Sequence, residues 1–393
     1  MSVETPSAPL QFLAAEPPNF MEKEIDQILI KAVEEKASDI VFSTGKPVWT
    51  RIHGKWLKCS RKILRLAELE NVQNIMARSP SSAAQISSGN DLDFRYEIQV
   101  DRFRRLRFRV NTTACQVGGG RGIELTFRSI PGKPLLPHQL FVEEGIMKSA
   151  FPIFGLVLIT GPVGSGKTTL LAALMRYSAT TDPRRILTYE YPVEYDLNED
   201  PEELIAPVTQ TEIPVDLRGG WPVAVRNSLR RAGDIVLMGE ARDKETISSL
   251  LEASETGVAT YSTSHTNGVV DTISRIVDVF PWEERDGMVR KMIANLRLVV
   301  NQRLFPNPKG GRQAVREYLE FTPDIRKHLL MLPYEKIVPK LDEFLGERGQ
   351  PLAVDARKKH AEGTLSDETL DQILSTVDAD RDIAEKVFGR RAS

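Results

Sequence analysis

Hydrophobic residues first recur with a helical period near the start of the chain. The apolar stripe of an amphipathic helix is formed at positions i, i+3, i+4, i+7 and i+8 by Ile25, Ile28, Leu29, Ala32 and Val33. Short β-like runs follow at 47–52 and 105–110, with a glycine-rich break at 118–120. This order of elements predicts a small α+β domain over residues 21–130.

Prolines mark the ends of that domain. Residues 1–20 contain four prolines and read as a flexible tail. The stretch 131–137 contains three prolines, which stiffen the chain and remove ladder donors, so we expect a linker over 131–140.

The pattern after the linker alternates between strands and helices. Four apolar runs, at 156–159, 186–188, 235–238 and 258–261, are separated by stretches long enough for crossover helices. Such spacing predicts a parallel sheet, and we place an α/β domain over 141–321. Residues 322–393 read as a helical, charged C-terminal region, in which 364–367 offers a helix cap.

Composition narrows the class of protein. The 393 residues are 41% hydrophobic and 27% charged, and their net charge of −2 gives no global attraction to nucleic acid. Two distant cysteines indicate neither a disulfide framework nor a zinc site. No run of 18 apolar residues occurs, and the N-terminus does not resemble a secretory signal. We therefore expect a cytoplasmic protein whose membrane association goes through a partner.

A phosphate-binding motif follows the first of these apolar runs. It reads G-x-x-x-x-G-K-T, and the predicted loop comprises Gly161, Pro162, Val163, Gly164, Ser165, Gly166, Lys167, Thr168 and Thr169. Its backbone amides would surround the phosphates of ATP, with Lys167 on the β- and γ-oxygens and the Thr168 hydroxyl on Mg²⁺. The alternative is a glycine-rich turn that binds nothing.

Polar residues follow three other apolar runs. Glu240 would lie at the carboxyl edge of the sheet and orient or deprotonate water, which is favoured over a solvated loop acid near the start of the next helix. Glu190 and Glu194 end another run and would hold the waters of Mg²⁺, although a surface loop explains their spacing equally well. His265 follows a further run, where it is either a γ-phosphate sensor or a structural hydrogen-bonding residue.

Arginines alternate with apolar residues in the run 105–110. Leu106, Phe108 and Val110 share one face, and Arg105, Arg107 and Arg109 share the other. A basic strand face can bind nucleic acid or reach a phosphate across a subunit boundary. From the residues alone, a solvated outer face is the favoured explanation.

Together the motifs resemble those of the secretion and retraction ATPases of the type II and type IV machinery. The similar segments cover residues 21–322 and include GPVGSGKTT, ILTYEYPVEY, DIVLMGEARDKETI, SETG, TSHTNGVVDTISRIVDVF, KASDIVFSTGKP and RFRVNTTAC. Within this PilT-like family the chain is most similar to the DotB group of Dot/Icm type IVB secretion and IncI-like conjugation. The segments NTTAC, QTEIP, VRNSLRR and REYLEF carry that finer similarity.

The resemblance implies a fold and an assembly. It implies a RecA-like P-loop NTPase domain, preceded by a small α+β (PAS-like) domain and followed by a helical extension. It also implies a homohexamer with ATP between the domains, completed by arginines that we identify as Arg107, Arg109, Arg121 and Arg128. Glu240 becomes the catalytic acid, with Glu190, Glu194 and His265 as partners. Tyr191 stands where retraction ATPases usually have aspartate, which leaves open which glutamate matters.

The expected function is that of a cytoplasmic Mg²⁺-dependent ATPase, recruited peripherally to the inner membrane, that powers a type IVB secretion or conjugative transfer apparatus. Its expected partners are inner-membrane or cytoplasmic components of that apparatus. Three alternatives remain: a pilus-retraction ATPase, a motor acting directly on DNA, and a nucleotide-gated scaffold. Nucleic acid is not the expected partner, although the arginine face permits it.

Overall fold

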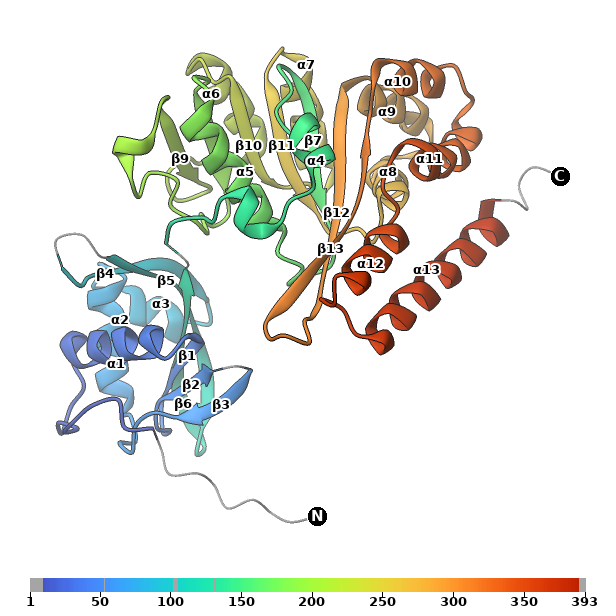
Figure 1. Cartoon of the computed structure of the whole chain (residues 1–393). Helices are drawn as coiled ribbons and strands as arrows, with labels where there is room; N and C mark the ends of the chain where they lie inside the picture. Colours follow the sequence, from blue (N-terminus) through green and yellow to red (C-terminus); the bar gives the residue numbers. More distant parts are fainter. Residues whose placement is uncertain (1–9, 53, 102–104, 131, 389–393) are drawn as a thin grey trace. The chain divides into compact units, whose positions relative to one another are not determined.

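The computed structural model describes residues 10–52, 54–101, 105–130 and 132–388. The chain divides into two compact units, Met1–Gly132 and Lys133–Ser393 (Figure 1). Of the expected tail and linker, residues 1–9 and 131 lie outside the described residues. Among the described helices, none is long and apolar enough to cross a membrane.

The first unit is a six-stranded antiparallel sheet packed against three helices. The sheet order is β3-β2-β1-β6-β5-β4. Its strands are β1 (Ala37–Ser43), β2 (Trp49–Ile52), β3 (Lys55–Lys58), β4 (Leu92–Gln99), β5 (Arg105–Val117) and β6 (Gly120–Ile130). The helices are α1 (Glu22–Glu34), α2 (Leu66–Met76) and α3 (Ser82–Ser87).

Helix α1 has the predicted amphipathic stripe. Ile25, Ile28, Leu29 and Ala32 are buried in the core of the first unit, and Val33 packs against that core. Part of the segment expected as a flexible tail packs there too, because Leu13 and Phe20 are buried in the same core. The prolines restrict the backbone of this segment, but its apolar side chains are still buried.

Strand β5 has the predicted alternation. Phe108 and Val110 are buried, whereas the arginines between them point away from the core. Neighbouring strand β4 supplies acids to this outer face. The Arg107 Nε atom lies 3.1 Å from an oxygen of Glu97, which is its cross-strand partner.

The second unit is built on a seven-stranded sheet. The sheet order is β13-β12-β7-β11-β10-β8-β9, and all neighbours are parallel except β12 and β13. Its strands are β7 (Gly155–Thr160), β8 (Ile186–Glu190), β9 (Val208–Glu212), β10 (Ile235–Glu240), β11 (Ala259–Ser264), β12 (Leu296–Pro306) and β13 (Arg312–Glu320). The four predicted apolar runs correspond to β7, β8, β10 and β11.

Helices cover both faces of this sheet (Figure 1). One face carries α4 (Glu144–Ser149) and α5 (Lys167–Thr181), and the other carries α6 (Gly220–Arg230), α7 (Lys244–Glu255), α8 (Val269–Asp278) and α9 (Trp282–Asn295). Leu156 and Leu158 of β7 enter one core, and Val157 and Ile159 enter the other. Burial on both faces explains why the strands are continuous apolar runs.

The C-terminal region is helical, as predicted. Its helices are α10 (Pro323–Leu330), α11 (Tyr334–Arg348), α12 (Leu352–Ala361) and α13 (Asp367–Phe388). Helix α12 packs on β13 through Leu352, Ala356 and Val315, and Ile373 of α13 joins the same cluster. The two last helices are therefore attached to the edge of the sheet (Figure 1).

Candidate active site

The predicted phosphate-binding loop connects the end of β7 to the start of α5. Gly164 and Gly166 have φ angles of 77° and 79°, which side chains with a Cβ rarely adopt. A Cβ at Gly161 would lie 2.2 Å from the Gln302 carbonyl oxygen, so the loop also packs tightly against β12. The resulting bend directs the first-turn amides of a 15-residue helix toward the loop.

Lys167 is held inside this loop. Its ammonium donates to the carbonyl oxygens of Gly161 (2.8 Å) and Pro162 (3.0 Å). Burial lowers the pKa of the Lys167 ammonium, while the carboxylates of Glu240 and Glu194 act in the opposite direction. Its two carbonyl partners are neutral, so an anionic phosphate would be a stronger partner for this cation.

His265 connects Lys167 to Glu240. Its Nδ1 atom lies 3.0 Å from Lys167 Nζ, and its Nε2 atom lies 3.3 Å from Glu240 Oε1. An ammonium can only donate, so Nδ1 accepts and Nε2 carries the proton that faces the carboxylate. Glu240 is the last residue of β10 and His265 follows β11, so the sheet brings both to one edge.

The two glutamates after β8 have different surroundings. Glu190 is buried, and its Oε1 accepts from Thr188 Oγ1 at 2.5 Å and from Gln210 Nε2 at 3.2 Å. Glu194 is exposed, and its charge acts on Lys167. Glu190 is thus held within the protein, whereas Glu194 is accessible to a ligand.

Hard oxygen donors lie near the start of α5, as Mg²⁺ requires. The Thr168 hydroxyl is adjacent to Lys167, and the Glu194 and Glu240 carboxylates act on the same lysine. Across the described residues, no three His, Cys, Asp or Glu side chains form a metal cage. The Thr168 hydroxyl and the two carboxylates are oxygen donors of the type that Mg²⁺ prefers.

The four arginines predicted to complete the site all belong to the first unit. Arg107, Arg109 and Arg128 face the acids Glu97, Asp93 and Asp39 at 3.1, 4.0 and 2.9 Å. Arg121 Nη1 donates to the backbone oxygen of Ser87 at 2.5 Å. Their role at the loop of the second unit stays a prediction.

Three residues near the loop were missed by the sequence analysis. The Tyr195 hydroxyl lies 2.8 Å from Thr169 Oγ1. Asn301 Nδ2 donates to Thr160 Oγ1 at 3.0 Å, and Gln302 Nε2 donates to the Ser165 carbonyl at 2.7 Å. Two adjacent amides directly after the apolar stretch 298–300 of strand β12 were the signal that could have revealed the last two.

A cavity of about 480 Å³ lies on the β12 side of the loop. It is lined by Val163 and Gly164 of the loop, Phe305 of β12, Arg312 of β13, and Gln372 and Thr376 of α13. Its volume is typical of small-molecule sites. Glu240, the last residue of β10, and His265, which follows β11, lie on the opposite side of β7 from β12.

The parallel sheet, the glycine-rich loop after β7 and the acid at the end of β10 define a P-loop nucleotide-binding protein. Residues 14–317 match the family model described as type II/IV secretion system protein. The chain belongs to this family.

Relatives of this family cover most of the chain. The type IV pilus retraction ATPase PilT of Pseudomonas aeruginosa is 36% identical over 306 residues, which are 77% of this chain and 84% of that protein. The structure of the Legionella pneumophila ATPase DotB superposes with a TM-score of 0.81 at 36% identity, covering 94% of this chain and 100% of that one. The pilus retraction motor PilT with bound ADP superposes with a TM-score of 0.75 at 28% identity, covering 88% and 95%.

These similarities agree with the predicted fold class. The second unit contains a RecA-like domain, preceded by a small α+β domain and followed by helices. The prediction of the secretion ATPase family is confirmed.

Proposed function

We propose that this chain is a Mg²⁺-dependent ATPase whose hydrolysis powers a type IVB secretion or conjugative transfer apparatus. The observation that carries the proposal is the row formed by Lys167, His265 and Glu240 beside the phosphate-binding loop. In this row, His265 lies between Lys167, which would hold the terminal phosphate, and Glu240, which would activate water.

The chemistry follows from the positions of these groups. The loop amides and the Lys167 ammonium hold the β- and γ-phosphates. Water attacks the γ-phosphorus while the bond to the β-phosphate oxygen breaks, and the proton of the water passes to Glu240. The Nε2 atom of His265, which lies 3.3 Å from Glu240 Oε1, would keep that carboxylate beside the phosphate. The Thr168 hydroxyl and the accessible Glu194 carboxylate would hold Mg²⁺, which would supply charge neutralisation.

The nucleoside is proposed to occupy the cavity beside β12. Glu240 and His265 lie on the β10 and β11 side of β7, so the γ-phosphate points to that side. An extended triphosphate in the loop then places its ribose and base on the opposite side. That side holds the cavity with Phe305 for base contact and Gln372 for hydrogen bonding.

The assembly is proposed to be a homohexamer with ATP between domain 21–130 and domain 141–321. Arg128 is the best candidate among the four arginines to complete such a site. Its side chain is 67% exposed, yet its Nε is fixed 2.9 Å from the buried Asp39. Closure of the two domains around ATP would gate hydrolysis and move an inner-membrane or cytoplasmic partner. We propose peripheral recruitment to the inner membrane through that partner.

We favour a type IVB or conjugation role over pilus retraction because of the share of this chain that aligns with each solved structure. The DotB structure aligns with 94% of the chain at 36% identity, against 88% at 28% identity for the PilT motor. Direct action on DNA is less favoured, because Glu97 and Asp93 accompany Arg107 and Arg109 on the same strand pair.

The proposal is tested by measuring ATP binding and phosphate release with Mg²⁺ for the wild-type protein, Lys167→Ala and Lys148→Ala. Lys148 is an exposed lysine on α4 that pairs with Glu144, so its variant controls for loss of a positive charge. We expect Lys167→Ala alone to abolish both signals. A wild-type protein that binds no ATP, or a Lys167→Ala variant that retains wild-type turnover, would contradict the proposal.

A further inference from the structure

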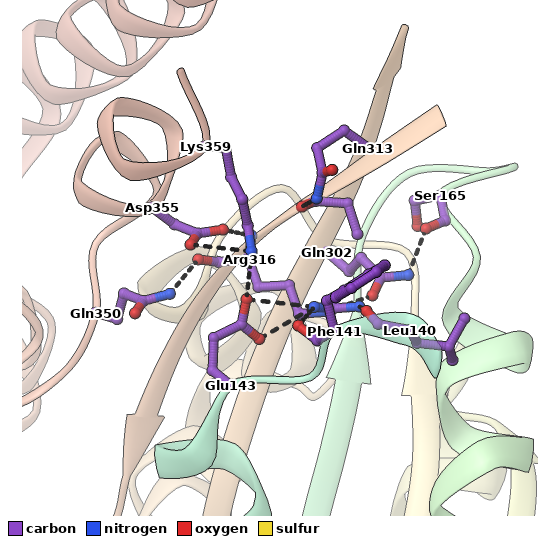
Figure 2. Close-up of polar contacts among 11 residues, drawn as sticks. Leu140, Phe141, Glu143, Ser165, Gln302, Gln313, Arg316, Gln350, Asp355 and Lys359 are labelled. Carbon is purple, nitrogen blue, oxygen red and sulfur yellow. Dashed lines mark hydrogen bonds and ion pairs between the residues drawn. The ribbon is translucent and has the colours of Figure 1, made fainter. Parts of the chain in front are cut away.

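Five polar side chains are buried together in the second unit, and the catalytic scheme uses none of them (Figure 2). They are Glu143, Gln302, Arg316, Asp355 and Lys359. These residues come from the segment before α4, from β12 and β13, and from α12. Burying two cations and two anions costs solvation energy, so their contacts must compensate for that cost.

Arg316 is the centre of this group (Figure 2). Its Nε donates to Gln302 Oε1 at 2.7 Å, and its Nη1 lies 3.1 Å from Glu143 Oε2. The same guanidinium donates to the backbone oxygens of Leu140 at 3.0 Å and Phe141 at 3.2 Å. One side chain thereby ties β13 to β12 and to the segment that leads into α4.

Gln302 connects the group to the phosphate-binding loop. Its Oε1 accepts from Arg316, and its Nε2 donates to the Ser165 carbonyl at 2.7 Å. The fit is close, because a Cβ at Gly166 would lie 3.0 Å from Gln302 Nε2. The amide therefore has a donor end on the loop and an acceptor end on the arginine.

Helix α12 contributes Asp355 and Lys359 to the buried polar group. Lys359 Nζ lies 3.5 Å from Glu143 and 3.9 Å from Asp355. Asp355 Oδ2 accepts from the backbone nitrogen of Arg316 at 2.9 Å. Burial and the neighbouring Glu143 raise the pKa of Asp355, while Lys359 and Arg316 oppose them. Asp355 and Lys359 lie beyond residue 317, where the match to the family model ends.

We propose that Gln302 is a positioning residue for the phosphate-binding loop, and that Arg316 and Lys359 anchor it to helix α12. The C-terminal helices then set the geometry of the loop at Ser165 and Gly166. The proposal rests on the proposed function only in taking this loop as the triphosphate site.

The substitution Gln302→Glu separates the two ends of the amide. A carboxylate still accepts from Arg316, and more strongly, but it has no donor for the Ser165 carbonyl. We expect the Kd for ATP and the KM to rise about tenfold, since a buried carbonyl loses its partner. The kcat at saturating ATP should stay within about twofold of wild type, because Gln302 does not touch the reacting atoms.

Gln350→Glu is the matched control. Gln350 Nε2 donates to the backbone oxygen of Arg316 at 3.1 Å, so the same chemical change is made beside Arg316 without touching the loop. Hydrogen exchange of the peptide covering 161–169 gives a readout that does not depend on ATP. We expect faster exchange in Gln302→Glu and wild-type exchange in Gln350→Glu.

Two results would overturn the proposal: wild-type Kd and loop exchange in Gln302→Glu, or equal changes in Gln350→Glu. If Gln302→Glu does not fold, Lys359→Met carries the test, because it cuts the anchor on α12 and retains the aliphatic stem. Faster exchange of 161–169 in that variant supports the anchor, and unchanged exchange rejects it. Absence of ATP binding in the wild-type protein would remove the proposed function, while the exchange comparison would still decide the role of Gln302.

Discussion

The Nε2 atom of His265 lies 3.3 Å from a carboxylate oxygen of Glu240. The opposite ring nitrogen faces the Lys167 ammonium and accepts from it, so the ring proton lies on Nε2, the nitrogen that faces Glu240. A positively charged lysine and a negatively charged glutamate are thereby kept apart by one ring instead of forming an ion pair.

Glu240→Gln should keep ATP binding and lose turnover. The amide has nearly the same shape but cannot accept a proton from water, so we expect kcat to fall about 100-fold or more. Phosphate release and ATP binding by calorimetry are the two measurements. Glu252→Gln, an exposed position on α7, is the control for loss of charge. Near wild-type turnover in Glu240→Gln would reject Glu240 as the base.

His265→Ala should reduce kcat more than it weakens ATP binding. Removal of the ring takes away the Nε2 atom that faces Glu240 and allows this carboxylate to pair directly with Lys167. Because general-base positioning is lost while the loop amides remain, we expect kcat to fall about tenfold to 100-fold. Steady-state kinetics over a range of ATP concentrations separate the two parameters. A change in KM alone would contradict this assignment.

Thr376→Trp should fill the cavity beside β12 and weaken binding of ATP. We expect the Kd for ATP to rise about tenfold, because an indole would exclude the base from a site of this size. Inorganic tripolyphosphate lacks the nucleoside, so its binding should not change. Ser375→Trp places the same side chain on an exposed neighbour that does not line the cavity. Equal losses for both ligands would show that the cavity does not hold the nucleoside.

Asp243→Ala should lower stability in a pH-dependent way. Asp243 caps α7, the helix that follows Glu240, and its carboxylate accepts from the Thr246 backbone nitrogen at 2.8 Å. That hydrogen bond lowers the pKa of Asp243 despite partial burial. At neutral pH we expect a loss of about 1 kcal/mol in the free energy of unfolding.

The sign of the pH effect follows from the lowered pKa. The stabilisation is complete above the ordinary aspartate pKa and is lost as pH falls through the lower value of the folded state. The difference between wild type and Asp243→Ala should therefore shrink as the pH falls below about 4. Urea unfolding at several pH values measures it. Asp371→Ala, at an exposed position of α13 that caps no helix, is the control for removal of an aspartate.

The sequence was sufficient to predict which residues lie at the carboxyl ends of the parallel strands, but not which residues hold them in place. Glu240 and His265 were found because each follows an apolar run, and parallel strands bring their carboxyl ends together. Glu190 met the same rule, yet Thr188 and Gln210 hold it inside the protein. Local spacing does not distinguish a buried carboxylate from an accessible one.

The support of the loop could not be predicted for a different reason. Arg316 and Glu143 are 173 positions apart in the chain, and their pairing depends on β13 lying beside β12. In the sequence, REYLEF is one of the segments that carry the resemblance, and nothing in it indicates which residue Arg316 contacts. Long-range pairs of this kind follow from topology and not from periodicity.

Helix α12 also bears on how the chain can be shortened. A protein that stops after β13 would lose Asp355 and Lys359 and expose the buried side of Arg316 to solvent. Trimmed forms prepared for crystallography or enzymology should therefore extend past Lys359, even though the family match ends at residue 317.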